Sequence, residues 1–168
     1  MQRISGIFGL ENVSSAEAIE IVSKMLSQGR EISLNLEVWS DERNLVLGAA
    51  GQSVVDTNSG DTIILSGEIE NTLELIDHLK SEGVQVENTV LLTALKAWGL
   101  EATLKKLKGK FSFAWWCASS EKLVIARDRF GIKPIYWCAE NEKGAIIFAS
   151  EIKTLLASGL ISRKVNKE

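Results

Sequence analysis

Residues 110–156 read KFSFAWWCASSEKLVIARDRFGIKPIYWCAENEKGAIIFASEIKTLL, and strand and turn signals alternate along them almost without a gap. Aromatic and β-branched residues predict strands over 111–117, 123–127, 135–138 and 145–149. The charged loop between the second and third strands contains Gly131 and the only proline of the chain. Ser150 is placed to cap a helix over 151–158, which Gly159 would end. These signals predict a four-stranded meander closed by a helix.

The remainder of the chain mixes strand and helix patterns. Strands are expected at 4–10, 32–39, 45–47 and 62–69. The capping box Ser14-Ser-Ala-Glu17 opens one helix, and Asn71 and Asn88 are placed to cap two more. Glycines at 29, 83 and 99 are the expected helix ends. We therefore expect a single α+β domain over residues 1–168, with two sheets or one large sheet.

Composition excludes some classes of function. At 168 residues with a formal net charge of −3, the chain has the size of one domain and lacks a basic nucleic-acid footprint. No apolar run approaches the roughly 20 residues of a membrane span. The first residues do not resemble a secretory signal, so the expected location is the cytoplasm. Self-association is left open.

The cysteines, the histidine and the tryptophans are interpreted as structural residues. Cys117 and Cys138 are far apart, and with His78 as the only histidine they form no metal-ligand spacing. The two thiols are expected to be buried, and His78 to lie at the surface. Three tryptophans are expected in the core: Trp115, Trp116 and Trp137. Neither a metal nor a cofactor is predicted.

Two motifs resemble a known family. Ala126-Arg-Asp-Arg-Phe-Gly-Ile-Lys-Pro134 and Phe148-Ala-Ser-Glu-Ile-Lys-Thr-Leu-Leu156 are similar to the end of a class II glutamine amidotransferase domain, as in glutamine-hydrolysing asparagine synthetases. The resemblance implies the four-layer αββα sandwich of N-terminal-nucleophile hydrolases. Full-length relatives add an ATP-using synthetase domain with a Ser-Gly-Gly-x-Asp-Ser motif. These 168 residues lack that motif, so the implied partner is a synthetase-type domain or protein.

The resemblance also implies where a nucleophile and an oxyanion hole would lie. The family opens with Cys-Gly-Ile-Phe-Gly, and the α-amine of that terminal cysteine is the base for its own thiol. The matching residues are Ser5-Gly-Ile-Phe-Gly9, preceded by four residues. The oxyanion-hole asparagine and glycine of the family match Ser66 and Gly67. Losing one oxyanion donor lowers rates about 100- to 1,000-fold.

The substrate-binding residues of the family are altered as well. Gly51 stands where relatives place the arginine that binds the glutamine carboxylate. Glu68 follows the oxyanion-hole position, and Glu87 falls near the acidic residue that meets the substrate ammonium. With nucleophile, oxyanion donor and carboxylate anchor all changed, we expect a domain that is silent towards glutamine and acts as a structural or interaction module.

Two other functions are kept open. One is a serine-type amidohydrolase (a glutaminase) matured by removal of residues 1–4, which would make Ser5 the terminal nucleophile. The other is a small-molecule sensor with an amino-acid pocket around Gly67 and Glu87. The retained loop has two interpretations of its own. One is an internal ion-pair network of Arg127, Asp128, Arg129 and Lys133, and the other is an anion site formed by the basic residues among them.

Overall fold

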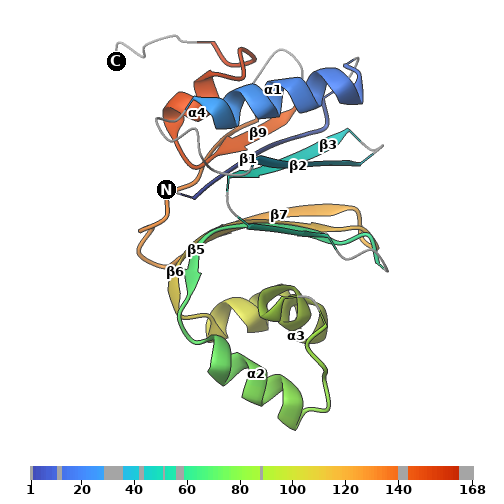
Figure 1. Cartoon of the computed structure of the whole chain (residues 1–168), viewed down its shortest axis with the longest axis vertical. Helices are drawn as coiled ribbons and strands as arrows, with labels where there is room; N and C mark the ends of the chain where they lie inside the picture. The colour runs from blue at the N-terminus through green and yellow to red at the C-terminus, as the bar shows by residue number, and fades with distance from the viewer. Residues whose placement is uncertain are drawn as a thin grey trace.

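The structure is a computed structural model that describes residues 2–10, 13–28, 36–41, 44–50, 52–55, 59–87, 89–139 and 144–162, with the backbone alone described at 52–55. Two antiparallel sheets lie face to face, and helices cover both outer faces (Figure 1). The four-layer αββα sandwich is therefore confirmed. Four sequence predictions lie outside the described residues, at least in part: the helix end at Gly29, the strand start at 32, the position Gly51 and the cap Asn88.

The first sheet has five strands in the order β2-β3-β1-β9-β8. Their bounds are β1 Arg3–Phe8, β2 Leu36–Asp41, β3 Leu45–Ala50, β8 Tyr136–Cys138 and β9 Ile146–Ala149. The strand β1 lies in the middle and pairs with β3 on one side and β9 on the other. The first strand in the sequence is therefore the centre of the sheet.

Helices α1 (Ser15–Ser27) and α4 (Ile152–Leu156) cover the outer face of this sheet. The predicted cap is confirmed, because the Ser14 hydroxyl oxygen accepts a hydrogen bond from the Glu17 N–H at 3.2 Å. The buried face of α1 packs closely on β3. A Cβ at Gly48 would lie 2.6 Å from Val22 Cγ1, so only glycine allows this approach of helix to strand.

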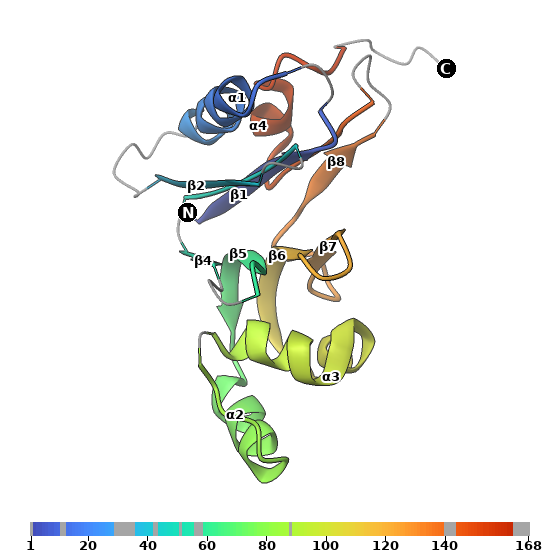
Figure 2. The ribbon, with the colours of Figure 1, turned by 90° about the vertical axis from the view of Figure 1, so that its right-hand side faces the viewer.

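The second sheet has four strands in the order β4-β5-β6-β7. Their bounds are β4 Gln52–Val55, β5 Thr62–Ile69, β6 Gly109–Cys117 and β7 Lys122–Arg127. Helices α2 (Thr72–Ser81) and α3 (Val90–Lys106) cover its outer face (Figure 2). Gly99, the predicted helix end, is a kink instead: its backbone angles are non-helical, but α3 continues to Lys106.

Three apolar clusters separate the four layers. The cluster between α1, α4 and the first sheet includes Ile7, Met25 and Ile147. The cluster between the two sheets contains, among others, Ile4, Trp116 and Phe148. The third cluster lies between the second sheet and α3 and is built from leucines of the helix and aromatic residues of β6.

The predicted meander is wrong. Strands β6 and β7 belong to the second sheet, whereas β8 and β9 belong to the first. The loop after β7 carries the chain from one sheet to the other, as Figure 2 shows. Local strand signals do not reveal a change of sheet, because hairpins in one sheet or in two have the same alternation of strands and turns.

Three predictions for individual residues are also wrong. The cap of α4 is Glu151, and Ser150 bonds to the backbone of β1 instead. Trp137 lies on the edge strand β8 with 65% of its surface exposed, whereas Trp115 and Trp116 are buried as expected. Cys117 and Cys138 are half-buried rather than buried, and neither forms a disulfide.

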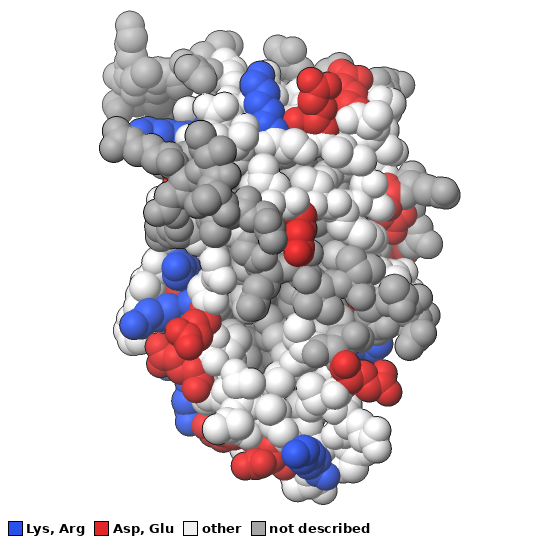
Figure 3. Space-filling view, viewed as in Figure 1, with Lys and Arg blue, Asp and Glu red and all other residues white. Residues whose placement is uncertain are grey.

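The surface carries both signs of charge. On the face of Figure 3, the described lysine and arginine side chains lie next to aspartate and glutamate side chains rather than in one basic patch. His78 is exposed on α2, as expected. Within the described residues, no helix is both long and apolar enough to cross a membrane.

Candidate functional site

Ser5, the residue at the nucleophile position, lies inside the central strand β1. It pairs with Gly48 of β3 and Ala149 of β9, and it has no exposed surface. Its neighbour Ile4 packs between the sheets, whereas Ile7 packs under α1 and α4. Side chains alternate along a strand, so Ser5 shares the face of Ile7 and is directed towards the helical layer.

The backbone on the N-terminal side of Ser5 is firmly bound. The Ile4 N–H donates to Ser150 Oγ at 2.9 Å, and the Ser150 N–H donates to the Ile4 carbonyl oxygen at 2.9 Å. The Ser5 nitrogen is thus an amide within a buried strand and not a free amine. Ser5 Oγ itself has no hydrogen-bond partner among the described residues.

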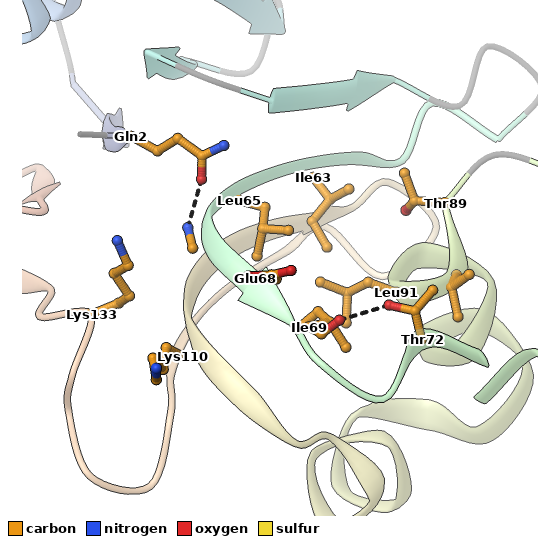
Figure 4. Close-up of a pocket in the computed structure, with 12 residues that line it drawn as sticks. Gln2, Ile63, Leu65, Glu68, Ile69, Thr72, Thr89, Leu91, Lys110 and Lys133 are labelled. Carbon is orange, nitrogen blue, oxygen red and sulfur yellow. Dashed lines mark hydrogen bonds between the residues drawn. The ribbon is translucent and has the colours of Figure 1, made fainter. Parts of the chain in front are cut away.

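Ser66 and Gly67, the residues at the oxyanion-hole position, lie together on β5 and both bond to Gln2. Ser66 Oγ donates to the Gln2 main-chain carbonyl oxygen at 2.8 Å. The Gly67 N–H donates to Gln2 Oε1 at 2.9 Å (Figure 4). The side-chain carboxamide of Gln2 is therefore hydrogen-bonded to the backbone N–H that the resemblance assigns to an oxyanion hole.

The conformation of Gly67 requires glycine. Its φ of +103° lies in the region that side chains rarely adopt, and a Cβ would overlap the Lys110 carbonyl oxygen. The same Cβ would lie 3.0 Å from Lys133 Cγ, so the Lys133 stem passes directly over this residue. The backbone conformation of Gly67 therefore fixes the N–H group that donates to Gln2.

A cavity of about 770 Å³ opens beside this contact (Figure 4). Its apolar walls are formed by residues of β5 and the start of α3, among them Ile63, Leu65 and Leu91. Its polar residues are Gln2, Glu68, Thr72, Thr89, Lys110 and Lys133. The volume is within the range of small-molecule pockets.

The structure brings together only part of the predicted site. Ser66, Gly67 and Glu68 follow one another on β5, and two of them line the cavity. Glu87 is exposed and lines a separate cavity of about 310 Å³ beside Lys96, so it is not part of the Gly67 pocket. Sequence reasoning missed Gln2, because nothing local to it indicates a contact with a strand 65 residues away.

The loop after β7 is held by one carboxylate. The Asp128 oxygens accept hydrogen bonds from the backbone N–H groups of Phe130, Ile132 and Lys133, at 3.0–3.1 Å. Burial works towards a higher pKa, but these donors outweigh it and hold the pKa of Asp128 below its usual value. The expected ion-pair network is wrong, because no basic side chain of the loop forms an ion pair with Asp128 in the described structure.

The described part of the chain contains no candidate metal site. No group of three or more His, Cys, Asp or Glu side chains there could hold a metal ion.

The comparisons with known proteins agree with the fold. The profile of the glutamine amidotransferase domain family matches residues 2–168. Glutamine-hydrolysing asparagine synthetase 3 of Bacillus subtilis is 36% identical over 146 residues, which is 77% of this chain and 23% of that protein. Glutamine-hydrolysing asparagine synthetase 1 of the same species is 28% identical over 168 residues, 91% of this chain and 26% of that protein.

Another relative is named as an amidase. The amidase chry2 of Gibberella zeae is 28% identical over 137 residues, 73% of this chain and 20% of that protein. The chain thus spans about a quarter of the length of these relatives or less. The match to the family profile over nearly every residue, together with the synthetase relatives, shows that the chain belongs to the class II glutamine amidotransferase domain family.

Proposed function

We propose that this chain is a glutamine amidotransferase-like pseudoenzyme that does not hydrolyse glutamine and serves as a structural or interaction module for a synthetase-type domain or protein. The observation that carries the proposal is the position of Ser5. Its side chain is fully buried, lies on the helix-facing side of β1, and follows a peptide bond where the family chemistry requires a free amine.

The state of the oxyanion-hole position supports the same proposal. The Gly67 N–H and the Ser66 hydroxyl are both already bonded to Gln2. A substrate carbonyl would have to displace these contacts before it reached the N–H. Ser66 lies in the second sheet, whereas the Ser5 side chain is directed away from that sheet, towards α1 and α4.

An interaction role is supported by exposed apolar side chains on a fixed loop. Phe130 and Ile132, between β7 and β8, are 85% and 50% exposed, and Trp137 on β8 is 65% exposed. The Asp128 hydrogen bonds hold the backbone that carries the first two. Large apolar side chains on a preordered backbone lose little entropy on docking and are typical of the centres of protein interfaces.

The relatives suggest which partner this surface serves. Two of those reported above are asparagine synthetases in which the matched region is about a quarter of the chain. The partner we propose is therefore a synthetase-type domain or protein, in the cytoplasm. The two half-buried cysteines, which form no disulfide, are compatible with a reducing compartment.

A serine-type amidohydrolase matured at Ser5 is the second candidate. The observation in its favour is Ser5 Oγ, which is buried without a hydrogen-bond partner among the described residues and so is not committed to a structural bond. This function requires cleavage between Ile4 and Ser5. Cleavage would also remove Gln2 and free the Gly67 N–H.

Glutamate release from glutamine, measured on the native chain and on Ser5→Ala, tests the proposal. We expect the two proteins to give the same background rate, and the intact mass to retain residues 1–4. Glutamine-hydrolysing asparagine synthetase 3 of Bacillus subtilis is the positive control. Release that disappears in Ser5→Ala, with a mass lacking the first four residues, would establish the second candidate instead.

The interaction role has a separate test. The chain is mixed with a synthetase-type protein from the same organism and analysed by size-exclusion chromatography with light scattering. We expect a complex of defined stoichiometry. Separate elution of both proteins at micromolar concentration would contradict this part of the proposal and leave the glutaminase result unaffected.

A further inference from the structure

Gln2 makes a contact that the strand pairing does not require. It precedes β1 of the first sheet, yet both its main-chain and its side-chain oxygen accept hydrogen bonds from β5 of the second sheet. The described part of β4 pairs with β5 only as far as Leu65, so on that edge Gly67 lies beyond its strand partner. The side chain of Gln2 accepts a hydrogen bond from the Gly67 N–H, which would otherwise face the cavity (Figure 4).

Lys133 adds a positive charge to the same place. Its stem passes over Gly67, and it lines the cavity. Its ammonium group has no ion pair or hydrogen bond with any residue that the structure describes. A backbone N–H and an unpaired lysine that line the same cavity favour a negatively charged oxygen, whereas Gln2 supplies a neutral one.

We propose that Gln2 is an internal ligand whose carboxamide closes a site for small carboxylates, formed by the Gly67 N–H and Lys133 at the mouth of the cavity. An external carboxylate binds there only when the Gln2 side chain has left. This competition exists in any chain that retains residues 1–4, and acetate binding is measured separately from glutamate release, so the two proposals can fail independently.

A series of variants at position 2 tests the proposal. Gln2→Ala removes the internal oxygen, Gln2→Met removes it while keeping the length of the side chain, and Gln2→Glu replaces it with a charged oxygen. Gln85→Ala is the matched control, since this glutamine is exposed and lines the other cavity. The probes are sodium acetate and acetamide at constant ionic strength.

Binding is followed through the Gly67 N–H signal in ¹H–¹⁵N spectra of the labelled chain. Because a net hydrogen bond of this kind corresponds to about a 5-fold change in an equilibrium constant, we expect acetate to bind about 5-fold more tightly to Gln2→Ala and Gln2→Met than to the native chain. Gln2→Glu should bind acetate more weakly than the native chain at pH 7. Gln85→Ala should match it.

The probes also separate this proposal from a purely structural role of Gln2. If Gln2 only ties the sheets together, Gln2→Met lowers the melting temperature but leaves acetate binding at Gly67 unchanged, and the proposal fails. Equal binding of acetate and acetamide to Gln2→Ala would overturn the role of Lys133. Loss of the acetate preference in the double variant with Lys133→Met would support it.

Discussion

The loop after β7 and the Gln2–Gly67 contact meet at Lys133, yet they keep their shape by different means. In the loop, one buried carboxylate, Asp128, accepts from three backbone N–H groups. At the contact, the fixed element is the backbone of Gly67, and its partner is a neutral side chain from another sheet.

This difference explains how such a domain can keep its frame while the residues at its oxyanion-hole position change. The loop depends on the carboxylate of Asp128, because its two oxygens are shared by three backbone donors. The oxyanion-hole position depends on a glycine but not on the residue before it. Ser66 can therefore stand where the family has asparagine without disturbing the strand.

Gly67→Ala should have the largest effect on stability. It forces a Cβ against the Lys110 carbonyl oxygen at φ +103°, and we expect a loss of about 3 kcal/mol, or about 10 °C in melting temperature. Gly83→Ala is the control, because Gly83 has a similar positive φ but nothing within 4 Å of an added Cβ. Its loss should be about 1 kcal/mol. Equal losses in calorimetry would show that the backbone at Gly67 is not fixed by β6.

Asp128→Asn should have the next largest effect. The amide keeps one acceptor but turns an N–H₂ group towards N–H donors, so we expect a loss of about 2 kcal/mol at pH 7 in urea unfolding. Asp77→Asn, on the exposed face of α2, is the control and should change stability little. A loss no larger than that of the control would mean that the loop holds its shape without the carboxylate.

The pH dependence of the same pair sharpens the test. The folded pKa of Asp128 is below its ordinary value of 3.8, so between these two values the unfolded chain binds a proton that the folded chain does not. This stabilisation is complete above 3.8 and is lost as the pH falls through the folded pKa. Asp128→Asn should remove that part of the acid dependence, and Asp77→Asn should keep it.

Phe130→Ala should have the smallest effect on stability. With 85% of its surface exposed, Phe130 contributes less than about 0.5 kcal/mol, and Leu73→Ala, 77% exposed on α2, should behave alike. The two variants should differ in docking, where only Phe130→Ala weakens the complex with a synthetase-type protein, by about 10-fold or more in titration calorimetry. Equal affinities of the Phe130→Ala and Leu73→Ala variants would show that Phe130 is not part of the interface.

Much of the fold was predictable from the sequence because its signals are local. The cap at Ser14 and the departure from helical geometry at Gly99 depend only on neighbouring residues, and the structure has both. The assignment of β6 to β9 to one meander failed because the sheet to which a strand belongs is decided by distant partners. Trp137 was misplaced for a related reason, since β8 is an edge strand and its exposure depends on what else covers the sheet.

The site was less predictable than the fold. The motif identified Ser5, Ser66 and Gly67 as corresponding positions, but it carried no information on the face of β1 that Ser5 occupies. The bond from Gly67 to Gln2 joins residues 65 positions apart on two sheets, and no pattern within either segment encodes it. Lys133 was predicted as a partner of Asp128 through its side chain and bonds to it through its backbone.

The position of β1 at the centre of the first sheet has a consequence for how the protein is made. During synthesis β1 emerges first, but its partner β9 lies at Ile146–Ala149, and Ser150, which bonds to Ile4, follows it. The hairpin of β6 and β7 needs only neighbouring residues and can form earlier. We therefore expect the ribosome-bound chain to hold an unfinished sheet until nearly the whole domain has emerged, with the apolar β1 exposed and available to chaperones.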